Sequence, residues 1–270
     1  MGEIRGRVLI VAGSDSGGGA GIQADIKTVT ALGGYASTAV TALTAQNTEG
    51  IADIRPVDAD FVAHQMRLVL DDIGADCIKL GMLCNAETTA AVCHVIEEAG
   101  EGIPLVVDPV MVAKDGRPLL EAGALDVLKK RLIPLATLFM PNIPEAETLT
   151  CMALRDVNQM RHAASMLITL GARAVMLKGG HMEGDVLADL LHWDGGEEVF
   201  EGQRVDRSDT HGTGCTLASA VAVGLAQGMG VHAAAVRARN YLREAILSAP
   251  GLGHGQGPLN HVHNISYYTG

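Results

Sequence analysis

Short apolar runs rich in β-branched residues alternate with amphipathic stretches along most of the chain. The first run, 7–12 (RVLIVA), leads into a glycine-rich segment and then into a helical pattern over 22–32. Strands that alternate with helices of about 10–15 residues are typical of βαβ units and a mostly parallel sheet. Further strands are predicted at 36–43, 51–57, 77–80, 105–108, 138–140 and 174–177, and further helices at 58–71, 87–99, 161–170, 213–226 and 231–247.

The helix expected over 58–71 shows how the pattern is interpreted. Asp58 stands at its start, where a carboxylate can accept from unpaired helix N–H groups. Phe61, Met66, Val69 and Leu70 are expected on the buried side of this helix.

Two later runs, 186–191 and 199–205, predict an antiparallel pair around Asp194-Gly195-Gly196. No internal repeat, linker or low-complexity tract interrupts the chain, so we predict a single α/β domain over 1–270.

Composition narrows the class of protein. Thirty-one acidic against 20 basic residues give a formal net charge of −11, which argues against nucleic acid as the main partner because phosphate backbones need a basic footprint. Hydrophobic residues make up 48% of the chain and aromatic residues only 3%, while glycines number 33. We expect an aliphatic core and loops that approach a ligand closely.

The five cysteines are widely spaced and include no C-x-x-C, which predicts neither a disulfide framework nor a zinc site. No run approaches the ~18–20 apolar residues of a membrane span, and the apolar start is too short for a signal peptide. We therefore expect a cytoplasmic protein without a membrane partner. His261-x-His263 lacks a third ligand nearby, so a solvated tail is favoured there over a metal site.

The strongest local signal is the string THGTGC at 210–215, which runs directly into an apolar helical pattern. A glycine-rich turn at a helix N-terminus presents unpaired N–H groups to an anion, here at Gly212, Thr213 and Gly214. Cys215 would lie in the first turn, where a thiolate is stabilised. The alternative is that the glycines allow close packing and Cys215 fills a small space; for the complete string we favour the anion site.

A second group of residues combines oxygen ligands with a cation. Asn142 and Glu145 have an equally good explanation as an ordinary N-cap and its first-turn acid. Followed by Lys178 at a strand end, they could also hold Mg²⁺ and phosphate. Ligands of open parallel sheets bind beyond the carboxyl ends of the strands. Five polar residues follow predicted strands at that edge: Asp15, Gln46, Asp108, Asn142 and Lys178.

The segment GSDSGGGAGIQAD at 13–25 could lay its backbone on a flat ligand. Its glycines fit neither the Rossmann nor the P-loop pattern. Asp25 would project from the next helix and accept from an amine or hydroxyl, and Gln46 could pair with the edge of a heterocycle. Singly, a flexible turn, a surface Asp25 and a capping Gln46 are the better explanations; together they favour a ligand site.

With these motifs the sequence resembles the hydroxymethylpyrimidine/phosphomethylpyrimidine kinases of thiamine biosynthesis, in the ribokinase-like family. The resemblance implies a three-layer α/β fold with a mostly parallel central sheet and an active site along its carboxyl edge. Many ribokinase-like enzymes have an aspartate where this chain has Cys215. The matching stretches are AGSDSGGGAGIQADIKT (12–28), TALTAQNTEGI (41–51), IKLGML (78–83), VVDPVMVAKDG (106–116), PNIPEAE (141–147), KGGH (178–181), THGTGCT (210–216) and GPLNH (257–261).

The resemblance also implies a reaction. The γ-phosphate of ATP passes to the hydroxymethyl group of 4-amino-5-hydroxymethyl-2-methylpyrimidine and then, in a second transfer, to the monophosphate, with Mg²⁺ as cofactor. Substrate contacts are implied at Gly13, Asp25, Gln46, Met82 and Val110. Nucleotide contacts are assigned to Asn142, Glu145, Lys178, Gly180 and Thr210, metal ligation to Asp108 and Glu145, and catalysis to Gly212, Thr213, Gly214, Cys215 and Lys178.

In the expected mechanism the N–H groups of 212–215 stabilise the moving phosphoryl group while Lys178 and Mg²⁺ neutralise its oxygens. Cys215 would accept the hydroxyl proton or orient the hydroxyl. Two alternatives remain: a pyridoxine or pyridoxal kinase, and a metabolite-binding module without turnover. A homodimer is expected from the resemblance.

Overall fold

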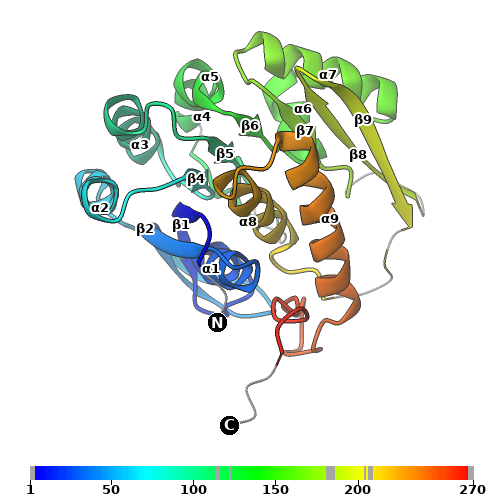
Figure 1. Cartoon of the computed structure of the whole chain (residues 1–270), viewed down its shortest axis with the longest axis horizontal. Coiled ribbons are helices and arrows are strands. Elements are labelled where there is room, and N and C mark those ends of the chain that lie inside the picture. The colour runs from blue at the N-terminus through cyan, green and yellow to red at the C-terminus, as the bar shows by residue number, and fades with distance from the viewer. Residues whose placement is uncertain are drawn as a thin grey trace.

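A single sheet runs through the molecule. The computed structural model describes residues 4–112, 116–121, 123–180, 186–203, 205 and 209–266. Nine strands within these residues form the order β3-β2-β1-β4-β5-β6-β7-β8-β9 (Figure 1). Their bounds are β1 Arg7–Asp15, β2 Tyr35–Gln46, β3 Ile51–Pro56, β4 Cys77–Leu80, β5 Leu105–Val107, β6 Leu138–Phe139, β7 Val175–Leu177, β8 Val186–Trp193 and β9 Gly196–Gln203.

The middle of this sheet is parallel and its edges are antiparallel. Strands β2, β1, β4, β5, β6 and β7 run in the same direction, so their carboxyl ends meet along one edge of the sheet. Strand β3 pairs antiparallel with β2, and β8 and β9 form an antiparallel hairpin beside β7. The predicted mostly parallel sheet and the predicted antiparallel pair are both confirmed.

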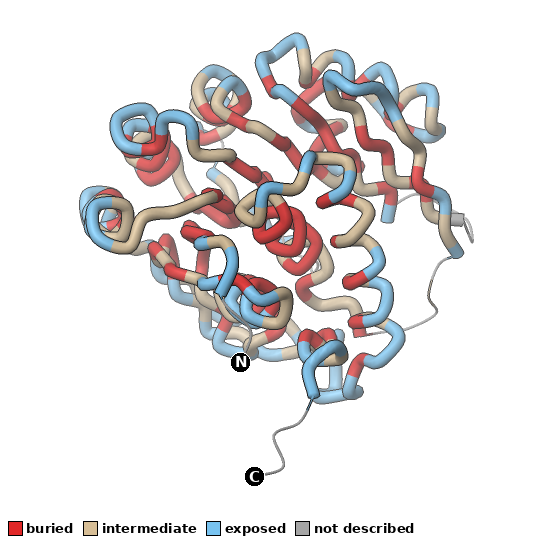
Figure 2. The backbone as a smooth tube through the Cα atoms, in the orientation of Figure 1, coloured by how far each residue is buried: buried red, intermediate tan, exposed pale blue. Residues whose placement is uncertain are grey.

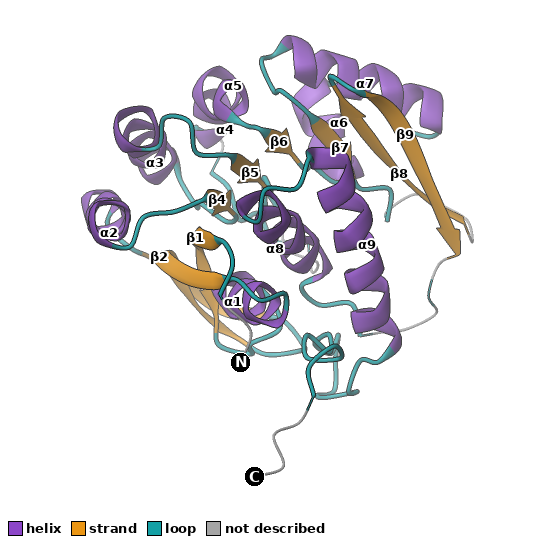
Figure 3. Cartoon of the chain, viewed as in Figure 1, coloured by secondary structure: helices purple, strands orange, loops and turns teal. Residues whose placement is uncertain are grey.

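Helices cover both faces of the sheet, which gives three layers (Figure 3). On one face lie α1 (Gly21–Ala31), α8 (Thr213–Ala226) and α9 (Val231–Leu247). The other face carries α2 Ala59–Asp72, α3 Ala86–Ala99, α4 Ala124–Val127, the π-helical turn Leu128–Leu132, α5 Ile133–Leu135, α6 Ile143–Thr150 and α7 Val157–Thr169.

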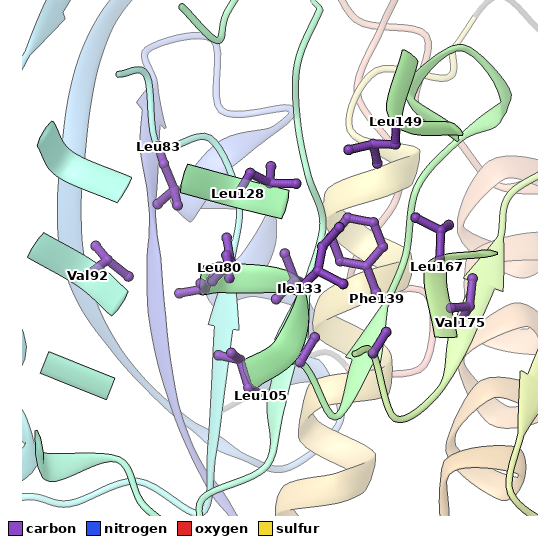
Figure 4. Packing of buried hydrophobic residues seen from close by; sticks show 14 of the residues in the cluster. Leu80, Leu83, Val92, Leu105, Leu128, Ile133, Phe139, Leu149, Leu167 and Val175 are labelled. Atoms are coloured by element: carbon purple, nitrogen blue, oxygen red, sulfur yellow. The ribbon is translucent and has the colours of Figure 1, made fainter. Parts of the chain in front are cut away.

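Alternation along the central strands divides the core into two clusters. In β1, Leu9 and Val11 pack toward α2 and α3, whereas Val8 and Ile10 pack toward α1 and α8. The first cluster is centred on Phe139 of β6 and is drawn in Figure 4. Figure 2 shows that the central strands and α8 are among the most buried parts of the chain. Helix α8 is therefore packed tightly against the face of the sheet that it shares with α1 and α9.

N-terminal capping residues fix the starts of α2 and α7, and two details of these helices differ from the prediction. Asp58 caps α2 as predicted, and its side chain accepts from the N–H of Phe61. The side chain of Phe61 itself is 57% exposed, contrary to expectation, because the buried stripe of α2 runs through Val62 and Met66 instead. Helix α7 begins before the predicted position because Asp156 caps it.

No prediction was made for 124–135, where a short α-helix, a π-helical turn and another short helix follow each other. None of the helices in the described ranges is both long and apolar enough to cross a membrane. All five cysteines are free thiols.

Candidate active site

A cavity of about 1470 Å³ lies along the edge where the parallel strands end, beside the N-terminus of α8. It brings together nearly all the residues that the sequence assigned to a ligand, although they come from segments far apart in the chain. The predicted residues that line it are Gly13, Gln46, Met82, Asp108, Val110, Asn142, Glu145, Lys178, Gly180, Thr210, Gly212, Thr213, Gly214 and Cys215. Asp25 is absent from this lining.

The turn before α8 has the backbone of an anion site. Gly212 is the N-cap residue and has φ of 84°, a left-handed conformation that favours glycine. A Cβ at this position would lie 1.9 Å from the carbonyl oxygen of Gly19, so the two loops can approach only without a side chain here. No side chain among the described residues caps α8. The helix N-terminus therefore faces the cavity with its own N–H groups.

An ion pair lies directly against this turn. Lys178 follows β7, and its backbone N–H donates to the carbonyl oxygen of Pro141 at 2.9 Å. Its ammonium pairs with the carboxylate of Asp108, which follows β5. A Cβ built on Gly214 would lie 3.3 Å from Asp108 Oδ2 and 3.5 Å from Lys178 Nζ. The cation thus lies within reach of any anion bound at the helix N-terminus.

Glu145 adds a second carboxyl group to this end of the cavity. It forms a capping box with Asn142: the Asn142 N–H donates to Glu145 Oε2 at 2.7 Å, and the Glu145 N–H donates to Asn142 Oδ1 at 2.9 Å. The pKa of Glu145 is raised to about 7, mainly by burial; the ammonium of Lys178 opposes the rise and the carboxylate of Asp108 adds to it. Burial lowers the pKa of Lys178, but Asp108 and Glu145 outweigh it and the pKa is raised. One lysine therefore faces two carboxyl groups.

Gln46 and its neighbours line the same cavity. This residue ends β2, and Gly13 of β1 and Met82 after β4 line the same space. Asp15, at the end of β1, accepts from the N–H groups of 17, 19 and 20 at 2.8, 3.0 and 2.8 Å. Its Oδ2 also lies 2.9 Å from Nε2 of His211. These contacts arrange the glycine-rich loop around a carboxylate.

Comparisons with known proteins identify the family of the chain. A family model described as phosphomethylpyrimidine kinase matches residues 15–260. The chain belongs to the phosphomethylpyrimidine kinase family. It is 52% identical to the thiamine biosynthesis bifunctional protein of Geobacter sulfurreducens over 96% of this chain, although it spans only 52% of that relative's length.

Other members of the phosphomethylpyrimidine kinase family match over nearly their full length. The hydroxymethylpyrimidine/phosphomethylpyrimidine kinase of Streptomyces coelicolor is 47% identical, over 94% of this chain and 93% of that protein. Among solved structures, the pyridoxal kinase of Staphylococcus aureus in complex with ADP has a TM-score of 0.88 at 33% identity, covering 97% of this chain and 94% of that one. The three-layer fold implied by the resemblance is confirmed.

Asp25, a predicted substrate contact, does not line the cavity in this structure. The carboxylate is completely buried, and both of its oxygens lie within 2.9 Å of Nζ of Lys79. Ser219 of α8 also donates to it at 2.6 Å. The α1 side chain turns toward β4 and α8 because a buried lysine there needs a counter-ion.

The electrostatics of the structure do not favour the thiolate expected at Cys215. The pKa of this thiol is raised to about 11, mainly by burial; the ammonium of Lys79 opposes the rise, and Asp25 and Asp108 add to it. The position in the first turn of α8 is as predicted, yet desolvation outweighs the helix dipole there. The side chain is a neutral thiol near pH 7.

The predicted solvated tail fails at His261, which is buried. Its Nε2 lies 2.9 Å from Oγ1 of Thr216 in the first turn of α8, and its carbonyl oxygen accepts from the Tyr241 hydroxyl at 2.6 Å. Burial lowers the pKa of this imidazole to about 4, so it is neutral near pH 7. The segment after α9 therefore supports the anion turn from behind.

Two further residues had no role in the sequence-based prediction. Lys79 belongs to a strand of four buried residues, and a lysine within so apolar a run is itself a signal of a hidden counter-ion. His211 stands inside the glycine-rich string and was given no function, although its ring touches the loop that surrounds Asp15. Both become visible only when distant segments are brought together.

Proposed function

We propose that this chain transfers the γ-phosphate of ATP to the hydroxymethyl group of 4-amino-5-hydroxymethyl-2-methylpyrimidine and then to the resulting monophosphate. The observation that carries the proposal is the layout of one cavity. The same cavity is lined by the helix N-terminus at 212–215 and Lys178, which suit phosphate, and by Gln46, which suits the edge of a heterocycle. The family assignment and the similarity to curated kinases support it.

The nucleotide would extend from the anion turn toward α9. That part of the cavity is lined by apolar side chains from β8, α8 and α9 and the segment after β9, which suit an adenine base: Leu187, Val205, Leu217, Leu242 and Ile246. The Staphylococcus aureus pyridoxal kinase, with the same fold, is described in complex with ADP. Asn142, Lys178, Gly180 and Thr210 would then border the phosphates.

Asp108 and Glu145 fit a magnesium ion. They present two carboxyl groups to the same cavity beside Lys178, which pairs with Asp108, and carboxylate oxygens are ligands that suit a divalent cation. Among the described residues no group of three or more His, Cys, Asp or Glu side chains could hold a metal. Phosphate oxygens and water would complete the coordination, as Mg²⁺ prefers. When bound, the ion supplies positive charge to the phosphate oxygens.

The chemistry requires positioning more than proton abstraction. The acceptor hydroxyl oxygen attacks the γ-phosphorus, the bond to the β-phosphate oxygen breaks, ADP leaves, and the hydroxyl proton passes to an oxygen of the transferred phosphoryl group or to water. The ammonium of Lys178 and the N–H groups of 212–215 stabilise the three oxygens of the moving group. Cys215, as a neutral thiol, can orient the hydroxyl but is a poor base. In the second transfer a phosphate oxygen replaces the hydroxyl as nucleophile.

We also propose a homodimer. The chain exposes large apolar side chains on β2 and α2, with Leu43 at 54%, Phe61 at 57% and Leu68 at 58% exposure. A second copy could cover part of this surface. Light scattering on the purified chain tests this, and a single monomeric species at micromolar concentration would contradict it.

ADP release on mixing with Mg-ATP and one acceptor at a time tests the kinase proposal. We expect turnover with the aminopyrimidine alcohol and with its monophosphate, and phosphorus NMR should identify the mono- and diphosphate products. A folded Lys178→Met variant is the matched control and should release ADP far more slowly. No ADP release with either pyrimidine would overturn the proposal and leave a binding module.

Pyridoxal phosphorylation is the second candidate, because the fold matches a pyridoxal kinase with a TM-score of 0.88. The same assay with pyridoxal and pyridoxine decides between them. A larger kcat/KM for pyridoxal than for the aminopyrimidine would make the second candidate the main activity.

A further inference from the structure

The turn after β7 carries Lys178, and hydrogen bonds hold the peptide groups on both sides of this residue. On one side the Lys178 N–H donates to the carbonyl oxygen of Pro141 at 2.9 Å, in the segment that follows the neighbouring strand β6. On the other side the Gly179 N–H donates to Oδ1 of Asp189 at 2.9 Å. The backbone before the lysine is thus held by another backbone, and the backbone after it by a carboxylate.

The register of the sheet explains why a carboxylate lies at this point. Strands β7 and β8 pair antiparallel with Leu177 opposite Leu190, where β7 ends, and β8 extends past that pair. Asp189, the adjoining residue of β8, therefore lies beside the turn. The turn also passes very close to β8, because a Cβ on Gly179 would lie 1.8 Å from the carbonyl oxygen of Ala188. Only glycine fits there, and it leaves the N–H within reach of the carboxylate.

An arginine of α9, the helix beside β8, holds the carboxylate of Asp189 (Figure 1). Oδ2 of Asp189 accepts from Nε of Arg239 at 2.9 Å. Phe200 lies directly opposite Asp189 on β9. Cζ of the arginine lies 4.7 Å from the centre of the Phe200 ring, and its Nη2 donates to the Phe200 carbonyl oxygen at 3.3 Å. Three contacts therefore hold the arginine, and the arginine orients the carboxylate.

Asp189 and Arg239 also line the cavity, so direct contact with the nucleotide is the alternative role. Each carboxylate oxygen already accepts from the protein, Oδ1 from the turn and Oδ2 from the arginine. The guanidinium is paired and stacked, which leaves it little freedom to turn toward a phosphate. A carboxylate directly beside phosphates would repel them. These contacts favour a role of Asp189 toward the turn rather than toward the ligand.

We propose that Asp189 is a positioning residue for Lys178. By holding the N–H of Gly179 it fixes the direction in which the lysine side chain leaves the backbone, and it thereby keeps the ammonium beside the anion turn. The lysine stem is flexible, so the ammonium is placed well only when the backbone that carries it is fixed. This inference rests on the proposed function, in which the ammonium stabilises the moving phosphoryl group.

A double-mutant cycle on kcat tests the proposal. Asp189→Ala should lower kcat by about 10–100-fold, because a displacement of about 1 Å at a reacting group has effects of this size. Combined with Lys178→Met, the same change should lower kcat by less than about twofold further, since no ammonium remains to be placed. Asp189→Asn keeps an oxygen that can accept from the Gly179 N–H and should retain more activity than the alanine variant.

Two further variants complete the experiment. Arg239→Met releases the carboxylate and should lower kcat less than Asp189→Ala, and this loss should also disappear in Lys178→Met. Glu197→Ala is the matched control. Glu197 belongs to the same hairpin and pairs with Arg161 of α7 at 2.6 Å, but it does not line the cavity. Its removal should leave kcat unchanged.

Each outcome bears on a stated claim. Equal fold losses from Asp189→Ala with and without Lys178→Met would overturn the inference, because neither a direct nucleotide contact nor a general loss of structure depends on the lysine. An unchanged kcat in folded Asp189→Ala overturns it too. If Asp189→Ala does not fold, the cycle of Arg239→Met with Lys178→Met decides by the same criterion.

Absence of turnover in wild type would overturn the proposed function instead. The same cycle is then measured on the Kd of the non-hydrolysable ATP analogue AMP-PCP. A loss of affinity in Asp189→Ala that disappears in Lys178→Met supports the positioning role, and equal losses in both backgrounds refute it.

Discussion

Two buried lysine–aspartate pairs flank α8, and they differ mainly in what else they touch. Lys79 of β4 pairs with Asp25 of α1, both side chains are completely buried, and Ser219 of α8 donates to the carboxylate. The other pair, Lys178 with Asp108, lies against Gly214 at the cavity, where the lysine side chain retains 12% exposure. The same two residue types thus occur once sealed and once open.

The difference shows how burial decides the role of an ion pair. The sealed pair has protein on every side, so it can only fasten α1, β4 and α8 together. The open pair faces the N–H groups of α8 and the carboxyl group of Glu145, so its lysine can be shared with an incoming phosphate. The first should matter for folding, and the second for turnover.

The largest effect is expected from Lys79→Met. It leaves the carboxylate of Asp25 buried without a cation, which typically costs about 3–5 kcal/mol of the free energy of unfolding. The double variant Lys79→Met/Asp25→Leu should recover most of that loss, because no charge remains. Urea unfolding of the three proteins measures this. Normal stability of Lys79→Met would refute the sealed role, particularly if its kcat fell.

Lys178→Met should behave in the opposite way. Removing one positive group from the moving phosphoryl typically lowers kcat by about 10²–10³-fold. Stability should change much less than in Lys79→Met, because water can reach Asp108 from the cavity. Steady-state kinetics and urea unfolding on the same preparation test both statements. A turnover rate within a few-fold of wild type would remove Lys178 from the mechanism.

The sequence predicts the open pair better than the sealed one, for a physical reason. Asp108 and Lys178 both follow strands, and the parallel order of those strands brings their carboxyl ends to one edge wherever the helices lie. Asp25 and Lys79 are 54 residues apart and meet on the face of the sheet that α1 and α8 cover. The periodicity of a strand or helix predicts which of its residues are buried. It does not predict which residue of another element each buried side chain contacts. Asp25 was therefore assigned to a ligand, because the sequence did not show that Lys79 is its partner.

Phe61 and His211 illustrate the same limit at a smaller scale. Near a helix terminus, an error of one residue in the periodic pattern exchanges a buried position for an exposed one. Phe61 was therefore expected to be buried, although its side chain is exposed and that of Val62 is buried. His211 gains its partners from three other segments, at Asp15, Gln46 and Gly257. No local pattern contains that information.

Glu145 sharpens the comparison through pH, because it is a buried carboxyl group beside the open pair, and its proton is sensitive to that pair. Its pKa is raised from 4.5 to about 7 by burial and by Asp108, against Lys178. Between these values the folded chain keeps a proton that the unfolded chain has lost, so stability falls as pH rises from 4.5 to about 7.

We expect wild type without nucleotide or metal to lose roughly 2 kcal/mol relative to Glu145→Gln between about pH 5 and about pH 8. Urea unfolding of both proteins at the two pH values measures the difference. Added Mg²⁺ with ADP should reduce it, since a bound cation offsets the charge. A constant difference between the two proteins across this range would show that the carboxyl is not held protonated.

Cys215 lies between the two pairs and should give the smallest effect. Burial raises the pKa of its thiol to about 11; Lys79 opposes this, and Asp25 and Asp108 add to it. A group this reluctant to ionise contributes little as a base at neutral pH, and a loose transition state needs little base assistance. Cys215→Ala should therefore keep kcat within about tenfold of wild type, whereas loss of a true general base typically costs about 10²–10⁴-fold.

The pH profile of kcat provides the independent check: it should be the same in wild type and Cys215→Ala. A wild-type rate that climbs toward alkaline pH, and flattens only in the alanine variant, would restore the thiolate as base and bring the sealed pair into the chemistry through Lys79.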